Sequence, residues 1–299
     1  MFKKSRKINY ILTFTLVFLL LFYYWQNHTL QITRYELTYE DLPKSFDGYR
    51  IVQISDMHGK TFGMENIGLA NKIKSLKPDI LFITGDMMSS TINDEGAFFE
   101  FLDHFDRACP MYMCLGNHEQ IASQLPNLSE NNNRFSNYIN NLTEKGVTLL
   151  DNRKITVENG EDSINIFGLT PELYHYSRRD IEPYDENLSL TESYIESVLG
   201  KSPKELNILL AHNPAYFEEY VSWGADLTLS GHIHGGIIRI PFLGGLFSPE
   251  KIFFPKYDAG LFESGDSKMI VNRGLGYSKI NIRLFNRPEI SLVELKNIP

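Results

Sequence analysis

Five short segments of this chain carry side chains that bind metal ions or transfer protons. They combine histidine with aspartate or asparagine, and they hold five of the chain's eight histidines. The segments are Asp56-Met57-His58, Gly85-Asp86, Gly116-Asn117-His118-Glu119, Ala211-His212-Asn213 and Gly231-His232-Ile233-His234-Gly235. Imidazole together with carboxylate ligands suits Mn, Fe or Zn better than Ca or Mg. This set of residues therefore predicts a site for divalent transition metal ions.

The spacing within the segments supports one shared site. Asp56 and His58, like His232 and His234, lie two residues apart, and such residues face the same side of an extended chain. Glycines at positions 85, 116, 231 and 235 allow the backbone to approach a crowded centre without a Cβ clash. Each segment alone has an ordinary explanation, such as a turn, a helix cap or a core histidine. Their joint occurrence favours the metal site.

The elements that must position these residues are strands in alternation with helices. Apolar runs predict strands at 50–55, 79–84, 111–115, 163–168, 206–211, 226–229, 269–271 and 290–294, and helical spacing predicts helices at 65–76 and 98–105. A β-α-β-α-β order favours a mostly parallel central sheet. The polar residues that directly follow these apolar runs should therefore meet at one carboxyl edge of the sheet, where ligands collect; they are Asp56, Asp86, Asn117, His212 and His232.

In their order, the five segments resemble the signature of the calcineurin-like metallophosphoesterases: Asp-x-His, Gly-Asp, Gly-Asn-His-(Asp/Glu), a later His and Gly-His-x-His. The resemblance extends to a membrane-attached bacterial branch of that family through residues 47–56, 231–241, 272–277 and 283–289. It implies an α/β fold, a four-layer αββα sandwich. Ile233 and Ile237 stand where this branch often has Thr and Gln, and Glu119 stands where Asp is commoner. These departures bear on substrate preference rather than on catalysis.

The resemblance also implies roles for the site residues. Asp56, His58 and His234 would hold one metal ion, Asn117, His212 and His232 would hold a second, and Asp86 would bridge the two. A water between the ions would then attack phosphorus. His118 would stabilise the transition state and protonate the leaving oxygen. Asp226 or Glu119 could orient a histidine.

The implied activity is hydrolysis of a phosphoester or pyrophosphate bond. The substrate would be a phosphate-containing small molecule, such as a nucleotide or a cell-envelope phosphodiester, or a lipid-linked phosphate. A binding or scaffold protein that has the same fold but no catalytic activity is the alternative.

The first residues predict a membrane anchor. Lys3, Lys4, Arg6 and Lys7 precede residues 8–25, eighteen residues without a formal charge that end in Tyr23-Tyr24-Trp25. The positive-inside rule places the N-terminus in the cytoplasm and the catalytic domain outside. A cleaved signal peptide is the alternative, but residues 25–30 contain no small-x-small cleavage site.

These signals predict a single-pass protein of the cell membrane. Residues 1–7 would form a cytoplasmic basic tail, 8–26 a transmembrane anchor, 27–46 a juxtamembrane connection with a first strand, and 47–299 the phosphoesterase domain. The residues after position 30 hold 25 basic and 37 acidic side chains, a net charge of −12. Such a domain has no overall attraction to nucleic acid, so we expect no nucleic-acid partner. Cys109 and Cys114, the two cysteines, are too far apart on one strand to form a disulfide.

A dense apolar stretch follows the last histidine motif. Residues 237–261 contain Phe242, Phe247, Phe253, Phe254 and Tyr257 between glycines and prolines, a composition typical of a loop. Two interpretations remain open: the loop fills a satellite core, or it is an apolar flap that faces the bilayer beside the metals and receives an acyl chain. Another probable loop could supply a polar wall for a head group through Tyr174, His175, Tyr176, Arg178 and Arg179.

Overall fold

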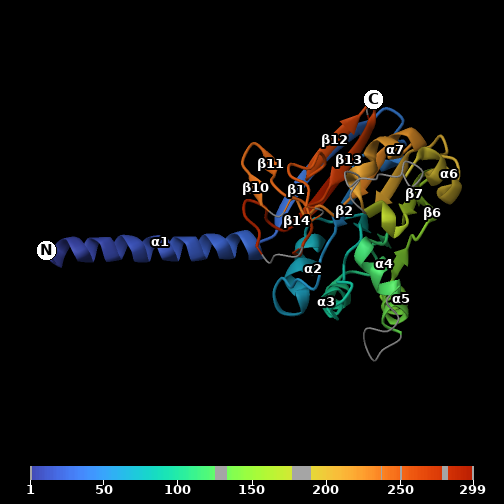
Figure 1. Cartoon of the computed structure of the whole chain (residues 1–299). Helices are drawn as coiled ribbons and strands as arrows, with labels where there is room; N and C mark the ends of the chain where they lie inside the picture. The colour runs from blue at the N-terminus through green and yellow to red at the C-terminus, as the bar shows by residue number, and fades with distance from the viewer. Residues whose placement is uncertain are drawn as a thin grey trace.

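Two six-stranded sheets face each other, and helices cover the outer face of each (Figure 1). The computed structural model describes residues 2–124, 133–176, 190–236, 238–249, 251–277 and 282–297. In order across the first sheet lie β1 (Gln31–Tyr39), β14 (Glu289–Asn297), β2 (Arg50–Ile54), β3 (Ile80–Ile83), β4 (Met111–Met113) and β5 (Val147–Leu149). In order across the second lie β12 (Gly260–Ser264), β13 (Ser267–Val271), β9 (Leu227–Ser230), β8 (Asn207–Ala211), β7 (Asp162–Leu169) and β6 (Arg153–Asn159). The expected four-layer αββα sandwich is confirmed, and the expectation of one central sheet is wrong.

Strand direction is what brings the polar segments together. β2, β3, β4 and β5 run parallel in the first sheet, and β7, β8, β9 and β13 run parallel in the second. Antiparallel strands lie only outside these runs, where β14 pairs with β2, β6 with β7, and β12 with β13. The carboxyl ends of each parallel run therefore lie along one edge of its sheet.

Alternation of side chains along the strands builds three cores for the four layers. Val52 and Ile54 of β2 pack in the core beneath α2 (Ile67–Lys74), α3 (Gly96–His104) and α5 (Arg134–Glu144), whereas Ile51 faces the second sheet. On the far side of the second sheet, Phe167 and Leu209 pack with α6 (Glu192–Leu199) and α7 (Phe217–Trp223). Both cysteines are free, and Cys114 is buried between the sheets.

One buried polar side chain joins the two sheets near the site. The side-chain amide of Gln53 in β2 donates to Thr84 Oγ1 at 3.0 Å and to the Ser230 carbonyl at 2.9 Å. Thr84 follows β3 of the first sheet, whereas Ser230 ends β9 of the second. Because buried amides must be paired, this contact fixes the relative position of the two edges.

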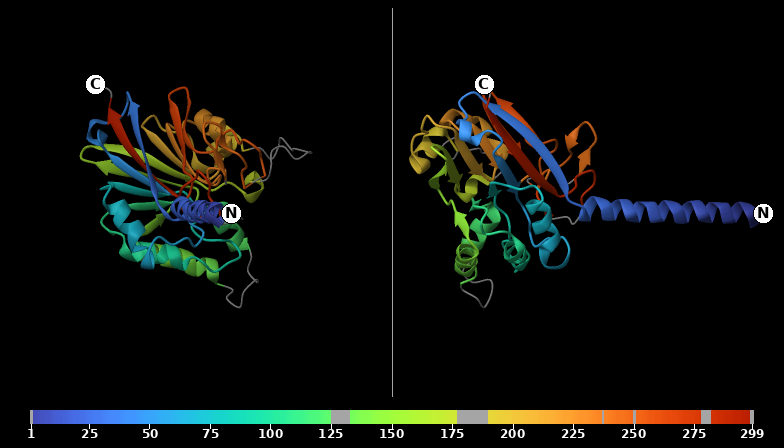
Figure 2. Two further views of the ribbon diagram at one scale, coloured as in Figure 1. Left: turned by 90° about the vertical axis from the view of Figure 1, so that its left-hand side faces the viewer. Right: turned by 180° about the vertical axis from the view of Figure 1, so that it is seen from behind.

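Helix α1 (Phe2–His28) projects away from the domain as a single rod (Figures 1 and 2). Its segment Lys7–His28 is long and apolar enough to cross a membrane. The last turn of α1 packs on the domain: Asn27 donates to the Arg283 carbonyl at 3.3 Å, and the Arg283 backbone N–H donates to Asn27 Oδ1 at 2.8 Å. The strand expected within 27–46 is β1, which pairs with β14 along its whole length.

The apolar residues 237–261 were expected to form either a satellite core or an exposed flap, and the structure shows part of each. Tyr257 is buried and its ring lies 5.8 Å from that of Phe217, so the core interpretation holds there. The short hairpin of β10 (Arg239–Ile240) and β11 (Gly244–Gly245) and the segment after it instead expose Phe242, Leu243, Phe253 and Phe254. Ile237 lies outside the described residues.

Candidate metal centre

The site lies where the ends of strands from both sheets meet. Asp56 and His58 follow β2, Asp86 follows β3, and α4 (Asn117–Gln124) begins at Asn117 after β4. The second sheet contributes His212 after β8, and His232 and His234 after β9. The residues were expected at one edge of one sheet, but the structure assembles them from two facing edges.

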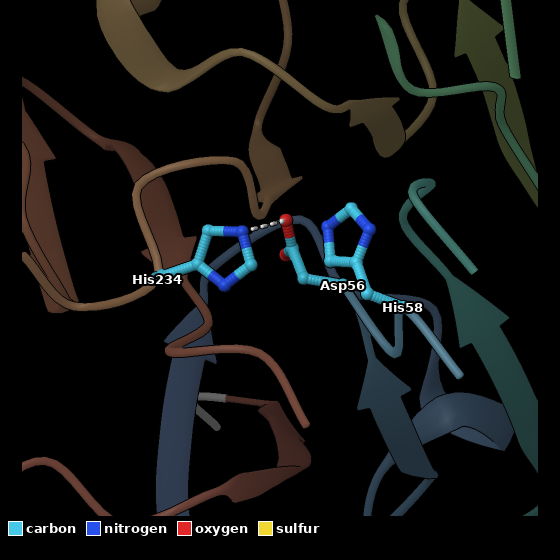
Figure 3. Close-up of side chains that lie close together, drawn as sticks. All are labelled: Asp56, His58 and His234. Carbon is cyan, nitrogen blue, oxygen red and sulfur yellow. Dashed lines mark ion pairs between the residues drawn. The ribbon is translucent and has the colours of Figure 1, made fainter. Parts of the chain in front are cut away.

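Imidazole and carboxylate atoms cluster there in overlapping groups. Asp56, His58 and His234 form one group, with ligand atoms within 4.8 Å of one another (Figure 3). Asp86, His212 and His232 form another, and Asp86 also groups with His58 and His118. Asp86 Oδ2 lies 3.1 Å from His212 Nε2 and 3.7 Å from His58 Nε2. One carboxylate thus stands between the two sets of histidines.

The turns that carry these side chains are left-handed. Positive φ angles occur at Asp56 (50°), His58 (42°), Asp86 (56°), His232 (70°) and His234 (52°). Asp56 and His58 therefore reach one group through a tight turn and not through the extended backbone expected from their spacing. His232 and His234 also have left-handed backbone, and they lie in different groups instead of facing the same side as expected. Left-handed backbone is unusual for residues other than glycine and is common in active sites.

Two glycines permit the close approach of the turns. A Cβ on Gly116 would lie 2.2 Å from Asp86 Oδ1, and one on Gly231 would lie 2.4 Å from Asp56 Oδ2. Real Cβ atoms essentially never make contacts this short. The expectation that glycines 116 and 231 make room at a crowded centre is confirmed.

Backbone amides and histidines surround the two carboxylates. The His232 N–H donates to Asp56 at 3.1 Å, and the His118 N–H donates to Asp86 Oδ1 at 2.8 Å. Burial acts to raise the pKa of Asp86, but His212 and His118 hold it well below its ordinary value. Burial acts to lower the pKa of His212, but Asp86 and Asp56 raise it to about 10. Opposite charges within the Asp86–His212 pair thus stabilise each other, whereas burial lowers the pKa of His58 to about 3 and leaves that ring neutral.

Backbone contacts also set which nitrogen of two histidines carries the proton. His212 Nδ1 lies 2.5 Å from the Thr84 carbonyl, which can only accept, so Nδ1 carries a hydrogen and Nε2 is the nitrogen that a metal could bind in place of a proton. His118 Nδ1 accepts the N–H of Ser90 at 3.0 Å, so the neutral ring carries its hydrogen on Nε2. Sequence reasoning missed Ser90 altogether. One feature of the sequence could have indicated Thr84, namely its position directly before Gly85-Asp86.

Among the described contacts, the two acidic residues considered as histidine orienters make no hydrogen bond to a histidine ring. Glu119 is fully buried, and its carboxylate accepts the backbone N–H groups of Asp86 at 2.8 Å, Met87 at 2.7 Å and Gly116 at 3.0 Å. It therefore joins the turn after β3 to the turn after β4. Asp226 accepts the Asn207 N–H at 2.7 Å. The expectation that either residue orients a histidine is wrong.

Buried atoms without partners show that the donor set fits metal ions. Among the described residues, His58 Nε2, Asn117 Oδ1 and His234 Nδ1 are buried and have no hydrogen-bond partner. Unpaired buried polar atoms are costly and rare, and a coordinated ion satisfies them. Imidazole nitrogens, carboxylates and an amide oxygen are also ligands that divalent transition metals accept.

A cavity of about 730 Å³ opens over these atoms. His58, Asn117 and His118 line it, together with Lys60 and Tyr277, two residues that sequence reasoning missed. Burial lowers the pKa of Lys60 to about 8, and its Nζ donates to the Tyr277 hydroxyl at 2.8 Å. Lys60 is the only lysine or arginine among the described residues that line this cavity.

The expected polar wall for a head group is only partly present in the described structure. Tyr176 lines the cavity, and its ring lies 5.2 Å from that of His232. His175 is buried against the rings of Tyr194 and Tyr216, and Tyr174 is partly exposed. Arg178 and Arg179 lie outside the described residues.

Comparison with known proteins identifies the class. The sequence profile of the calcineurin-like phosphoesterases matches residues 49–236, more than half of the chain. The chain belongs to the calcineurin-like phosphoesterase family.

Three relatives illustrate its range. The chain is 26% identical to the uncharacterized metallophosphoesterase YkuE of Bacillus subtilis, over 92% of this chain and 88% of that protein. It is 27% identical to UDP-2,3-diacylglucosamine pyrophosphatase LpxG of Chlamydia muridarum, over 90% and 91%. It is also 27% identical to phosphodiesterase YaeI of Escherichia coli, over 83% and 82%. Membership of this family and the similarity to named hydrolases identify the chain as a phosphoester hydrolase.

The approach of Gly116 to Asp86 can be tested directly. Gly116→Ala should lower the bound divalent metal, because the new Cβ must displace the Asp86 carboxylate. Gly96→Ala, at the start of α3 with no atom within 4 Å of the new Cβ, is the matched control. Elemental analysis of the full-length protein purified in detergent, with thermal melting as a check on folding, gives the readout. Equal metal content in both variants would contradict the close approach.

Proposed function

We propose that the cluster is a two-metal reaction centre for hydrolysis of a phosphoester or pyrophosphate bond. Asp56, His58 and His234 hold one ion; Asn117, His212 and His232 hold the second; Asp86 is shared. The observation that carries this assignment is that Asp86 belongs to histidine groups on both of its sides. Mn, Fe and Zn suit this donor set. When bound, such ions polarise the phosphoryl oxygens and lower the pKa of a water that attacks phosphorus.

His118 acts on the leaving oxygen in this proposal. It lines the cavity beside the ligands, and the Ser90 N–H holds it in the tautomer that presents Nε2–H. That hydrogen can be donated to an oxygen on which charge develops in the transition state. Full proton transfer from an imidazolium requires a second proton on Nδ1, and the Ser90 contact opposes this. The Ser90 contact therefore favours hydrogen-bond donation over complete transfer.

The cavity wall supports a substrate presented at a membrane. Lys60 Nζ lies 3.4 Å from His28 Nδ1, and the Tyr277 hydroxyl lies 3.4 Å from the Asn27 carbonyl. Both contacts join the cavity to the last turn of α1. Of the relatives, LpxG is named as a UDP-2,3-diacylglucosamine pyrophosphatase and YaeI as a phosphodiesterase. We infer a lipid-linked phosphate or a cell-envelope phosphodiester, with a nucleotide as the soluble candidate.

Substrate class is tested by a screen of phosphomonoesters, phosphodiesters and pyrophosphates with the full-length protein in the presence of Mn. The full chain is required because the last turn of α1 packs on the domain. Hydrolysis of none of the three classes, by protein that has bound two ions, would overturn the proposed function.

Asp86→Ala should abolish hydrolysis and reduce the bound metal from two ions to one or none. The reason is that Asp86 contributes to both groups of ligands. Asp103→Ala, an exposed aspartate on α3, is the control and should retain both ions and full activity. A variant at position 86 that still binds two ions would remove the assignment of Asp86 as the shared ligand.

His118→Asn should keep both metal ions and lower kcat by about 10² to 10³, the usual cost of removing one positioned hydrogen-bond donor to developing charge. The loss should be smaller for nitrophenyl esters than for alkyl esters, because a good leaving group needs less stabilisation. His104→Asn places the same substitution on a partly exposed histidine of α3 and should have no effect. An equal loss for both ester types would exclude an action of His118 on the leaving oxygen.

Membrane orientation gives a further prediction. We propose that α1 crosses the cell membrane once, with the basic residues 3–7 in the cytoplasm and the domain outside. Protease added to intact cells should then digest the domain. Complete protection until the membrane is disrupted would reverse the orientation.

A further inference from the structure

Exposed apolar side chains gather on the face of the domain from which α1 leaves. Outside α1, the described chain exposes eleven large apolar side chains, and six belong to the segments 242–254 and 282–285. They are Phe242, Leu243, Phe253, Phe254, Ile282 and Phe285, here called the hairpin face. Both views show the β10–β11 hairpin on the same side of the domain as α1 (Figures 1 and 2).

Three phenylalanines of the hairpin face have left-handed backbone, and their rings are exposed. Phe242, Phe254 and Phe285 have φ angles of 70°, 49° and 52°. Left-handed backbone is costly for bulky side chains, and it persists only where the surrounding structure requires it. Phe242 is nonetheless fully exposed, and Phe254 and Phe285 are about half exposed. These rings gain little burial within the domain in return for the strain.

The hairpin face is continuous with the surface of α1. The Phe285 ring lies 5.6 Å from the ring of Phe22 in α1. Two residues further on, the Arg287 guanidinium lies 4.8 Å from the ring of Trp25. Side chains of the domain therefore extend the apolar surface of the helix at the level of its last two turns.

A cavity within the same face combines cationic and apolar walls. It measures about 530 Å³ and is lined by Arg239, Lys256 and Arg273 as well as by Phe242, Phe254 and Phe285. Arg239 is paired with Asp258 at 3.0 Å, and Arg273 Nε lies 3.9 Å from Glu289 Oε1, an ion pair without a hydrogen bond in the described structure. Arginines beside aromatic rings match the boundary between lipid phosphates and acyl chains.

We propose that the hairpin face enters the leaflet in which α1 ends, so that the domain contacts the bilayer through two elements instead of one. The occupant of this surface is lipid, with its phosphates beside Arg239 and Arg273 and its acyl chains beside the phenylalanines. Continuity with α1 decides this, because a surface that extends a membrane-spanning helix lies at the depth of the headgroups. The inference rests on α1 as a membrane span and is independent of the chemistry at the metal centre.

A fluorescent label reports the environment of the face. In full-length protein carrying Cys109→Ser, bimane is attached at Leu243→Cys and, as the control, at Lys201→Cys. Position 201 follows α6, which lies on the side away from α1, and its side chain is exposed. Phe14→Cys in α1 reports insertion of the anchor. The proteins are placed in nanodiscs of phosphatidylglycerol and phosphatidylcholine that contain doxyl-labelled lipid, and iodide is the soluble quencher.

We expect doxyl lipid to quench position 243 several-fold more than position 201, and iodide to show the reverse order. Quenching at position 14 together with free access of iodide to position 243 would overturn the proposal while leaving the anchor in place. Shielding of position 243 from both quenchers would also overturn it, because the cover would then be a protein, such as a second copy of this chain. None of these outcomes depends on hydrolysis, so the proposed function is tested separately.

Discussion

The main physical constraint on this molecule is the burial of two carboxylates away from water. Asp56 and Asp86 are almost completely buried, and removing an ionised group from water costs several kcal/mol unless opposite charge and hydrogen bonds replace the lost hydration. Backbone N–H groups of His232 and His118 supply part of that replacement, and imidazoles of both sheets stand within 4 Å. Divalent ions would supply the rest. The packing of the two sheets face to face, with their carboxyl edges adjacent, meets this need because it brings ligands of both sheets to one site.

The turns that carry the proposed ligands have strained backbone, and contacts with the surrounding layers keep these turns in place. Five of the seven proposed ligands have left-handed backbone, and such residues cost about 1–3 kcal/mol each. Buried polar contacts enforce the strained turns. Glu119 binds the turns after β3 and β4 through three backbone N–H groups, and Gln53 joins the ends of β3 and β9. The ligands are therefore held in position by contacts that involve no metal.

Much of the fold could be predicted from the sequence, because apolar runs and the polar residues that follow them are local signals. Strands β2, β3, β4, β7, β8, β9, β13 and β14 lie at or near their predicted positions. The division into two sheets could not be read from strand order, since nothing in the runs at 163–168 or 206–211 says which edge they join. β6 was missed because its alternate residues are exposed and polar, which weakens the apolar signal.

The site shows the same limit. Residue types identified the candidate ligands and the structure brings them together, but their individual roles remain predictions. Spacing suggested extended pairs, whereas Asp56 and His58 meet through left-handed turns. Partners such as the Thr84 carbonyl and the Ser90 N–H are backbone groups, which every residue carries, so no residue type marks them. The stretch after His234 was undecided because exposed and buried phenylalanines look alike in sequence.

Only Thr29 and Leu30 separate α1 from β1, and the last turn of the helix is already bonded to the domain through Asn27 and Arg283. Arg283 in turn donates to the Gly276 carbonyl at 2.8 Å, and the Gly276 N–H donates to the Asp56 carbonyl at 2.6 Å. As the proposed membrane anchor, α1 is thus joined to the domain by a short, hydrogen-bonded connection and not by a flexible linker. An enzyme on a flexible linker can take many positions above a membrane, whereas one on a rigid helix keeps its cavity at a fixed distance from the lipid. For the proposed membrane-borne substrate, the rate of encounter would then depend on lateral diffusion and on the surface density of the substrate.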